Sequence, residues 1–127
     1  MGSPNHALSI LAVDSEPLLL NLYEEVFTQL GHQVTAVNSG AGALRAVSAS
    51  AAHFDVVITD LSMPEMNGLT LRNKLRDRVP GIPVYAVSSW ANYPEYRERI
   101  LHQFDGALGK PFHIEELESL ISQVKTE

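Results

Sequence analysis

The feature that most constrains this chain is a regular alternation of short apolar runs with longer amphipathic segments. Short apolar runs rich in β-branched residues are typical of strands buried on both faces, whereas leucine, isoleucine and valine at helical spacing indicate amphipathic helices. Strands that alternate with helices pair in parallel through right-handed crossovers. The sequence therefore predicts an α/β fold, a doubly wound five-stranded parallel sheet with five helices on its two faces. The predicted strands cover residues 8–13, 33–37, 54–59, 82–87 and 105–109, and the predicted helices cover about 19–30, 41–50, 69–79, 94–102 and 114–124.

Turn and cap residues mark the ends of several of these helices. Gly31 follows the first helix at the position where a glycine commonly ends a helix. Ser39 and Asn67 precede the second and third helices, where a side-chain oxygen can accept a free backbone N–H. Pro94 suits the first turn of the fourth helix, since a missing N–H is tolerated there. The connections are therefore short, as expected for a single compact unit.

Composition narrows the class of protein further. A chain of 127 residues with 45% hydrophobic residues has the size and core of one domain, which we expect over residues 8–126 after a flexible leader or tag remnant at 1–7. The net charge of −6 disfavours nucleic acid as a partner of this domain. The chain has no cysteine and no apolar run long enough for a membrane span. We therefore expect a cytoplasmic domain without disulfides and without a membrane partner.

Polar side chains follow four of the five predicted strands. Asp14, Asp60 and Ser88 come at the ends of the first, third and fourth strands, and Lys110 follows the fifth. Ligands of open parallel sheets bind at this edge. Carboxylate oxygens suit Mg²⁺, and an aspartate beside Mg²⁺ and a lysine can accept a phosphoryl group. The alternative interpretation is that Asp14 and Ser88 only cap the helices that follow them.

The third strand leads into the segment Asp60-Leu61-Ser62-Met63-Pro64-Glu65-Met66-Asn67-Gly68, with Val13-Asp14 upstream and Lys110-Pro111-Phe112 downstream. Together these motifs resemble the receiver domains of two-component response regulators, over residues 8–125. The resemblance implies a flavodoxin-like sheet with strand order 2-1-3-4-5. It also implies a signalling domain rather than an enzyme, and a cis peptide bond between Lys110 and Pro111.

The resemblance assigns a role to each polar residue. Asp60 corresponds to the phosphoacceptor, which takes a phosphoryl group from a sensor histidine kinase or a histidine phosphotransfer protein. Asp14 corresponds to an acidic residue that supports Mg²⁺, and Ser62 to the position whose backbone carbonyl binds the metal. Ser88 corresponds to the hydroxyl residue that turns toward the aspartyl phosphate, and Lys110 to the lysine that pairs with the phosphoryl group. The family commonly contacts its output partner through the fourth helix, fifth strand and fifth helix.

Two positions depart from the family pattern. Ser15 replaces the second acidic residue, which normally binds Mg²⁺ directly, so we expect weaker Mg²⁺ binding. Glu16 and Glu65 are the candidates to compensate through water. Ala107 replaces the aromatic ring that moves when the hydroxyl residue moves, so the switch must work differently or be weakly coupled. Trp90, near the expected mouth of the site, is either a partly buried packing residue or a lid over the phosphoaspartate.

Three alternative functions stay open at this stage. Ser15 and Ala107 favour an interaction module that has the receiver fold but is not phosphorylated. A flavodoxin has the same topology, although the two carboxylates in the loop after the first strand, Asp14 and Glu16, would repel a flavin phosphate. A phosphatase that uses two aspartates after a strand would need an aspartate where this chain has Ser62.

Overall fold

A computed structural model describes residues 7–49 and 53–124 of the chain. The expected leader at 1–7 therefore falls almost wholly outside the described residues, as do the predicted helix end at Ser50 and the expected domain end at residue 126. The strands are β1 (Ser9–Val13), β2 (Gln33–Val37), β3 (Val56–Asp60), β4 (Val84–Ser88) and β5 (Gly106–Gly109). The helices are α1 (Pro17–Gln29), α2 (Gly40–Ser48), α3 (Gly68–Arg78), α4 (Pro94–Gln103) and α5 (Ile114–Ser122), and a short 3₁₀ helix, η1 (Ser89–Asn92), follows β4.

The five strands form one parallel sheet in the order β2-β1-β3-β4-β5, which confirms the predicted fold and strand order. β3 lies at the centre of the sheet and β2 at an edge. All residues of β3 and β4 are buried, as the apolar runs predict for strands covered on both faces. The carboxyl ends of β1, β3, β4 and β5 therefore lie side by side at one edge of the sheet.

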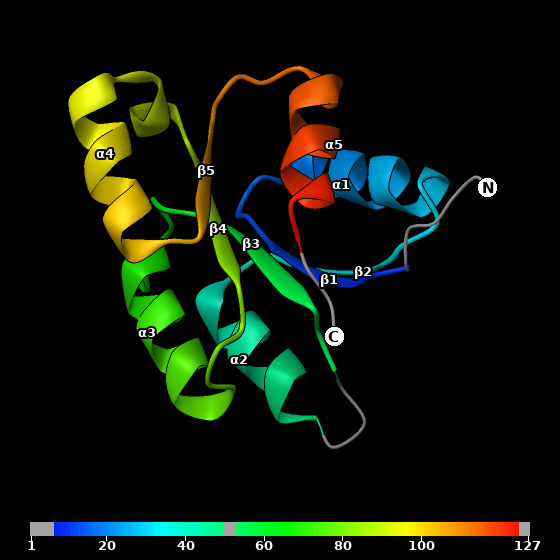
Figure 1. Ribbon diagram of the computed structural model, residues 1–127. Helices are drawn as coiled ribbons and strands as arrows, with labels where there is room; N and C mark the ends of the chain where they lie inside the picture. Colours follow the sequence, from blue (N-terminus) through cyan, green and yellow to red (C-terminus); the bar gives the residue numbers. More distant parts are fainter. Residues whose placement is uncertain (1–6, 50–52, 125–127) are drawn as a thin grey trace.

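Successive strand residues point to opposite faces, and each face has its own core. Ile10 and Ala12 of β1 belong to the core beneath α1 and α5, whereas Leu11 and Val13 belong to the core beneath α2, α3 and α4. Figure 1 shows this layering, with α1 and α5 on one side of the sheet and α2, α3 and α4 on the other. The sheet is thus held between two helical layers.

The predicted caps are confirmed. Ser39 Oγ accepts a hydrogen bond from Gly42 N at 3.0 Å, and Asn67 Oδ1 accepts one from Thr70 N at 2.9 Å. Gly31, just after α1, has φ +94°, a conformation that glycine adopts without steric cost. Within the described parts of the chain, no helix has the length and apolar character needed to cross a membrane.

The element bounds differ from the predicted ones in small ways. α1 begins at Pro17, two residues before the predicted start, because proline fits the first turn of a helix. β3 and β4 each begin two residues later than predicted. The short helix η1 was not predicted, since four residues are too few to show a helical repeat.

Candidate functional site

The carboxyl edge of the sheet brings the four predicted polar residues together. Asp60 is the last residue of β3 and Ser88 the last residue of β4, while Asp14 and Lys110 directly follow β1 and β5. Asp14, Asp60 and Ser88 are three of the four buried polar or charged residues in the described chain. Burying a polar group costs folding free energy. Three buried polar residues at one edge of the sheet therefore lower the stability of the fold at this place.

Lys110 is the centre of this cluster. Its Nζ atom donates a hydrogen bond to Asp14 Oδ2 at 2.9 Å and lies 3.4 Å from Asp60 Oδ2. The more exposed carboxylate of Glu16 lies 3.8 Å from the same nitrogen. One ammonium group therefore holds two carboxylates from different strands, and the Asp14 side chain is completely buried. The Lys110–Pro111 peptide bond is cis, as the family resemblance implies.

The interactions within the cluster do not fully stabilise the ionised carboxylate of Asp60. Burial, opposed by the charge of Lys110 and reinforced by that of Asp14, raises the pKa of Asp60 above its ordinary value. Burial alone would lower the pKa of Lys110, but the hydrogen bond and charge of Asp14, together with Asp60, outweigh it and raise this pKa. Lys110 is therefore firmly cationic, whereas the ionised form of Asp60 is held at a cost.

The loop after β3 positions the backbone around Asp60. Ser62 N donates to Asp60 Oδ1 at 3.3 Å, and Gly68 N closes the loop on Leu61 O at 2.9 Å. A side chain at Gly68 would place its Cβ 2.5 Å from the carbonyl of Asp60, so glycine is required there. Glu65 adopts φ 71°, a left-handed conformation that is costly for a residue with a side chain. The loop is thus held in one tight shape beside the carboxylate.

The capping alternative holds for Ser88 and is wrong for Asp14. Ser88 is the N-cap of η1, and its Oγ accepts a hydrogen bond from Trp90 N at 3.1 Å. The N-cap of α1 is Glu16, and Asp14 Oδ1 instead accepts from Glu16 N at 2.9 Å. The proton of the Ser88 hydroxyl is left for another acceptor, since accepting a hydrogen bond does not use it.

Trp90 differs from the expectation that it is a partly buried packing residue. It is 47% exposed, and its ring packs against Tyr96 and Tyr93 at centroid distances of 4.8 Å and 6.1 Å. Arg99 lies over the Tyr96 ring at 5.6 Å. The three rings shield one another on the surface of η1 and α4, which explains why Trp90 needs no place in the core.

The residues at the two departures lie in different surroundings. Ser15 is exposed at the site, and Glu16 and Glu65, the residues considered as compensating ligands, are exposed as well. Ala107 is buried at 5% exposure among the residues beneath α4. Ala107 has a methyl group in place of an aromatic side chain, so β5 carries no ring at this position that could rotate as a switch.

The oxygen donors at this edge fit a Mg²⁺ ion. Magnesium prefers hard oxygen ligands, needs only one or two carboxylates and keeps several of its waters. Asp14 and Asp60 supply two carboxylates, and Ser62, held beside Asp60 by its own N–H, can supply a backbone carbonyl. No group of three or more histidine, aspartate or glutamate side chains in the described residues is arranged to hold a metal. Two carboxylates and one carbonyl leave positions for the waters that Mg²⁺ keeps in such sites.

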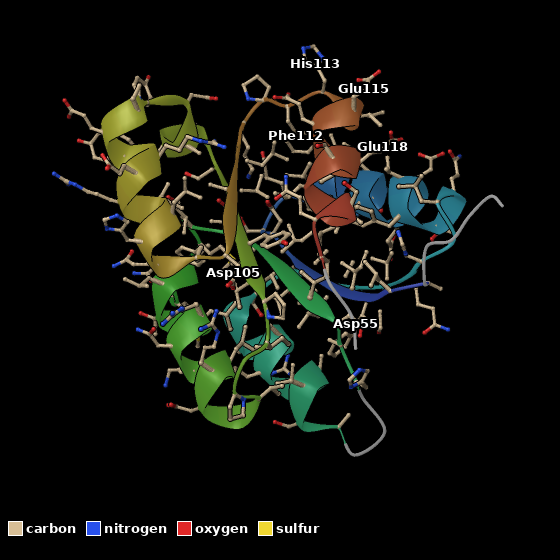
Figure 2. All side chains as sticks on the ribbon, in the orientation of Figure 1. Asp55, Asp105, Phe112, His113, Glu115 and Glu118 are labelled. Carbon is tan, nitrogen blue, oxygen red and sulfur yellow. The ribbon has the colours of Figure 1, made fainter. Side chains whose placement is uncertain are left out.

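Two residues beside the site were not found from the sequence. Asn92 Nδ2 donates to the carbonyl of Lys110 at 2.6 Å and so ties η1 to the segment after β5. Tyr23 of α1 is buried beside Phe112, which follows Lys110 by two residues. Figure 2 labels Phe112 and His113 where the chain enters α5, at the end of the molecule that carries the site. Neither residue belongs to a motif, so only the folded arrangement reveals them.

Solved structures share this architecture. The chain superimposes on the Vibrio cholerae chemotaxis protein CheY4 with a TM-score of 0.81 and 25% sequence identity, covering 94% of this chain and all of that one. The receiver domain of the sensor histidine kinase PA1611 from Pseudomonas aeruginosa gives a TM-score of 0.79 at 25% identity and coverage of 94% and 98%. That structure is described with a magnesium ion coordinated in its active site cleft. The class defined by fold and site is therefore that of CheY-like receiver domains.

Sequence comparison identifies the family itself. The response regulator receiver domain family matches residues 10–122, and the chain belongs to this family. The two-component response regulator PhoP of Pseudomonas aeruginosa is 34% identical over 91% of this chain and 50% of its own length. The sensor protein EvgS of Escherichia coli is 32% identical over 92% of this chain but only 10% of its own length. The chain is thus a receiver domain of two-component signal transduction.

Proposed function

We propose that this domain accepts a phosphoryl group on Asp60 from a phosphohistidine of a cytoplasmic sensor histidine kinase or histidine phosphotransfer protein. The observation that carries the proposal is the placement of the Asp60 carboxylate at the end of the central strand, 3.4 Å from Lys110 Nζ and next to buried Asp14. A structural carboxylate has no need of a second buried carboxylate beside it. A nucleophilic carboxylate that works with a cation benefits from a second carboxylate, because the two carboxylates can hold one metal ion together.

The transfer is a displacement at phosphorus. An oxygen of Asp60 forms the new O–P bond while the P–N bond to the donor imidazole breaks. The imidazole nitrogen keeps the bonding electron pair and takes up a proton. Lys110 Nζ, already within reach of Asp60, neutralises negative charge on the phosphoryl oxygens. Most of the catalysis therefore comes from positioning and charge.

A Mg²⁺ ion would be held by the carboxylates of Asp14 and Asp60 and by the backbone carbonyl of Ser62. When bound, Mg²⁺ supplies positive charge that offsets the charge of the phosphoryl group. Ser15 stands where the family has its direct acidic ligand, and its neutral hydroxyl is a weak replacement. The site should therefore fill at higher Mg²⁺ concentrations than a site with a third carboxylate.

Phosphorylation affects the rest of the domain through a change in the hydrogen bonds of Ser88. Its hydroxyl proton can be donated to a phosphoryl oxygen, and the rotation this requires competes with the hydrogen bond from Trp90 N. Loosening that cap changes η1 and, through it, α4, which lies beside β5. The surface of α4, β5 and α5 is the proposed contact with an output partner. The chain spans about a tenth to a half of the length of the two curated relatives described above.

The direct test is the intact mass of the protein after incubation with acetyl phosphate, with and without Mg²⁺. We expect one added phosphoryl group that depends on Mg²⁺ and is absent from Asp60→Asn. Asp55→Asn is the matched control, because Asp55 lies just before the other end of the same strand. The asparagine in this variant still offers an oxygen that can accept the hydrogen bond from Ser9 N. An adduct that persists in Asp60→Asn would contradict the proposal.

The serine at position 15 allows the metal site to be sharpened. Ser15→Asp restores a third carboxylate, and the Mg²⁺ midpoint for phosphorylation should fall by an amount worth about one to a few kcal/mol. The measurement is the same mass assay across a series of Mg²⁺ concentrations, with Ser89→Asp on exposed η1 as a control for added charge. Equal midpoints for the parent and Ser15→Asp would show that position 15 takes no part in metal binding.

The second candidate function is a receiver-fold interaction module that is not phosphorylated. Exposed Ser15 and buried Ala107 favour it, because each removes a part of the family machinery. The absence of any adduct across the whole Mg²⁺ series would transfer the proposal to this alternative.

A further inference from the structure

A buried hydroxyl without a partner lies beneath the site. Among the residues that the structure describes, only Tyr23 Oη and Arg72 Nε are buried side-chain polar atoms that form no hydrogen bond. Arg72 still donates through another nitrogen, to Asn73 Oδ1 at 2.9 Å, whereas the hydroxyl is the only polar atom of the Tyr23 side chain. A buried donor without an acceptor costs stability, so an unpaired one in a native fold calls for an explanation.

The ring of Tyr23 is firmly held and directed at the site. It is 1% exposed and stacks on Phe27 at 5.9 Å and on Phe112 at 6.3 Å, with interplanar angles of 5° and 9°. α1 begins three residues after Asp14, and side chains on a helix lean toward its N-terminus. The phenol of Tyr23 therefore extends from the second turn of α1 toward the sheet edge that carries Asp14. Phe112, on the other side of the ring, connects this position to the segment that carries Lys110.

The surroundings of the phenol are acidic. Burial is the main cause that raises the pKa of Tyr23, and the charges of Asp14, Asp60 and Glu16 raise it further. The hydroxyl therefore keeps its proton throughout the physiological range and can only act on these carboxylates as a donor.

Asp14 is the acceptor whose partners change during the proposed reaction. Its Oδ1 accepts from Glu16 N, and its Oδ2 accepts from Lys110 Nζ, both at 2.9 Å. When Lys110 turns to an oxyanion on Asp60, Oδ2 of this fully buried carboxylate loses this hydrogen bond, and a Mg²⁺ ion held by Asp14 would still leave lone pairs of the carboxylate free for another donor. We propose that Tyr23 is a positioning residue, whose hydroxyl takes over the hydrogen bond to Asp14 Oδ2 when Lys110 Nζ moves to the oxyanion. This inference rests on the proposed function, since only an oxyanion at Asp60 draws the lysine away.

The proposal makes the resting and occupied states differ in one hydrogen bond. In the resting state the hydroxyl is unpaired and destabilises the fold. In the occupied state the hydroxyl and Asp14 satisfy each other. An interaction present in one state alone shifts the equilibrium toward that state. Removing the hydroxyl should therefore have opposite effects on the empty and the occupied protein, which a residue of purely structural importance would not show.

The test uses Tyr23→Phe, which removes only the hydroxyl, and Tyr85→Phe as the matched control. Tyr85 is likewise buried, at 4% exposure, and its pKa is raised by burial and by Asp105, at the opposite edge of the sheet. Two quantities are measured: the melting temperature of the empty protein, and the affinity for beryllofluoride at a fixed Mg²⁺ concentration, followed by Trp90 fluorescence. For Tyr23→Phe we expect an equal or higher melting temperature and an affinity about tenfold lower, the size of a hydrogen bond to a charged group. Tyr85→Phe should bind as tightly as the parent.

A double-mutant cycle with Asp14→Asn identifies the acceptor. If the phenol acts through Asp14, the loss caused by Tyr23→Phe should shrink to about twofold in the Asp14→Asn background. The role of the phenol would be overturned if Tyr23→Phe bound beryllofluoride as tightly as the parent, or if its loss of affinity were undiminished in the Asp14→Asn background. Either result would leave the proposed phosphoacceptor function unaffected. A parent protein that does not bind beryllofluoride at any Mg²⁺ concentration would overturn the proposed function, and this inference with it.

Discussion

At the edge where the strands begin, Asp55 and Asp105 each accept a backbone N–H, whereas at the edge where they end, Asp14 and Asp60 share one lysine. Asp105 Oδ2 accepts from Val84 N at 2.8 Å and from Arg76 at 2.7 Å. Asp55 Oδ2 accepts from Ser9 N at 2.8 Å. Figure 2 labels Asp55 and Asp105 below Phe112 and His113 in the view, on the side where the strands begin.

A simple rule describes the beginning edge. The residue before a strand accepts the first free N–H of a neighbouring strand: Asp55 from Ser9, and Asp105 from Val84. His32, just before β2, accepts on Nδ1 a hydrogen bond of 2.9 Å from the N–H of Leu8, the residue just before β1. These acceptors satisfy donors that the parallel ladder leaves open. Each acceptor thereby fixes the position of one strand against the next.

The edge of the sheet where the strands end follows no such rule. Asp60 receives one backbone N–H at 3.3 Å, has a carboxylate neighbour and is buried with its pKa raised. The comparison teaches that carboxylates bonded to the backbone of a neighbouring strand stabilise the sheet, while two carboxylates that share one lysine keep capacity for a ligand. The same residue type is structural at one end of β3 and, in our proposal, chemical at the other.

The largest effect should come from removing the shared cation. Lys110→Met keeps the length of the side chain but leaves Asp14 and Asp60 without their ammonium partner. We expect a loss of about 3 kcal/mol in the free energy of unfolding by urea at pH 7.5, since a buried carboxylate without its cation is strongly destabilising. Lys110→Arg, which keeps the charge, should lose much less. A loss for Lys110→Met of about 1 kcal/mol or less would mean that the cluster behaves as an ordinary surface ion pair.

The next effect is at the beginning edge. Asp105→Ala removes the acceptor of Val84 N and the partner of Arg76, so we expect a loss of about 1.5 kcal/mol in the same unfolding experiment. Asp77→Ala, at an exposed position of α3, should change stability by less than about 0.5 kcal/mol. Phosphorylation of Asp105→Ala should be unchanged while it is folded. A reduced rate of phosphorylation would erase the distinction between the two edges.

A smaller effect of opposite sign should follow from Asp60→Asn. Because burial raises the pKa of Asp60, the folded protein binds a proton there more readily than the unfolded chain does. Ionised Asp60 therefore destabilises the fold, and stability is lost as pH rises through its folded pKa. In thermal unfolding we expect Asp60→Asn to be more stable than the parent at pH 7.5 and to lose this advantage as the pH falls toward the ordinary pKa of an aspartate. A variant less stable than the parent at pH 7.5 would place Asp60 among the structural carboxylates.

The smallest effect concerns His32. Burial lowers its pKa, so the unfolded chain binds the proton more readily. The stability from the neutral imidazole is present above the unfolded pKa and is lost as pH falls through the folded pKa. Between pH 7.5 and 5.5 the parent should lose about 0.5 kcal/mol more than His32→Asn, roughly one neutral hydrogen bond. Parallel stability curves for the two proteins would show that the bond from Leu8 N carries no pH dependence.

Much of the fold could be predicted because its signals are local. Two-sided apolar strands, amphipathic helices and the caps Ser39 and Asn67 each lie within a few residues of what they determine. Strand bounds moved by up to two residues because pairing with neighbours decides them. The surface position of Trp90 could not be predicted, since it depends on Tyr93 and Tyr96 packing against the ring.

The site could be predicted only to the level of the sheet edge. Parallel strands end at one edge, so the meeting of Asp14, Asp60, Ser88 and Lys110 follows from the topology. Their partners do not, because Lys110 reaches Asp14 across a separation of 96 residues. The unpaired hydroxyl of Tyr23 is further from prediction still, since in the sequence Tyr23 is one aromatic residue among leucines. Side-chain direction, which sequence spacing does not specify, decides each of these contacts.

The most direct test of the account is to find which carboxylate becomes the acyl phosphate. The protein is treated with acetyl phosphate and Mg²⁺, then reduced with borohydride, which converts an aspartyl phosphate to homoserine, and its peptides are sequenced by mass spectrometry. We predict homoserine at position 60 alone, with aspartate intact at 14, 55 and 105. Homoserine at position 55 or 105, or at none of the four, would contradict the claim that the two edges of this sheet divide structure from chemistry.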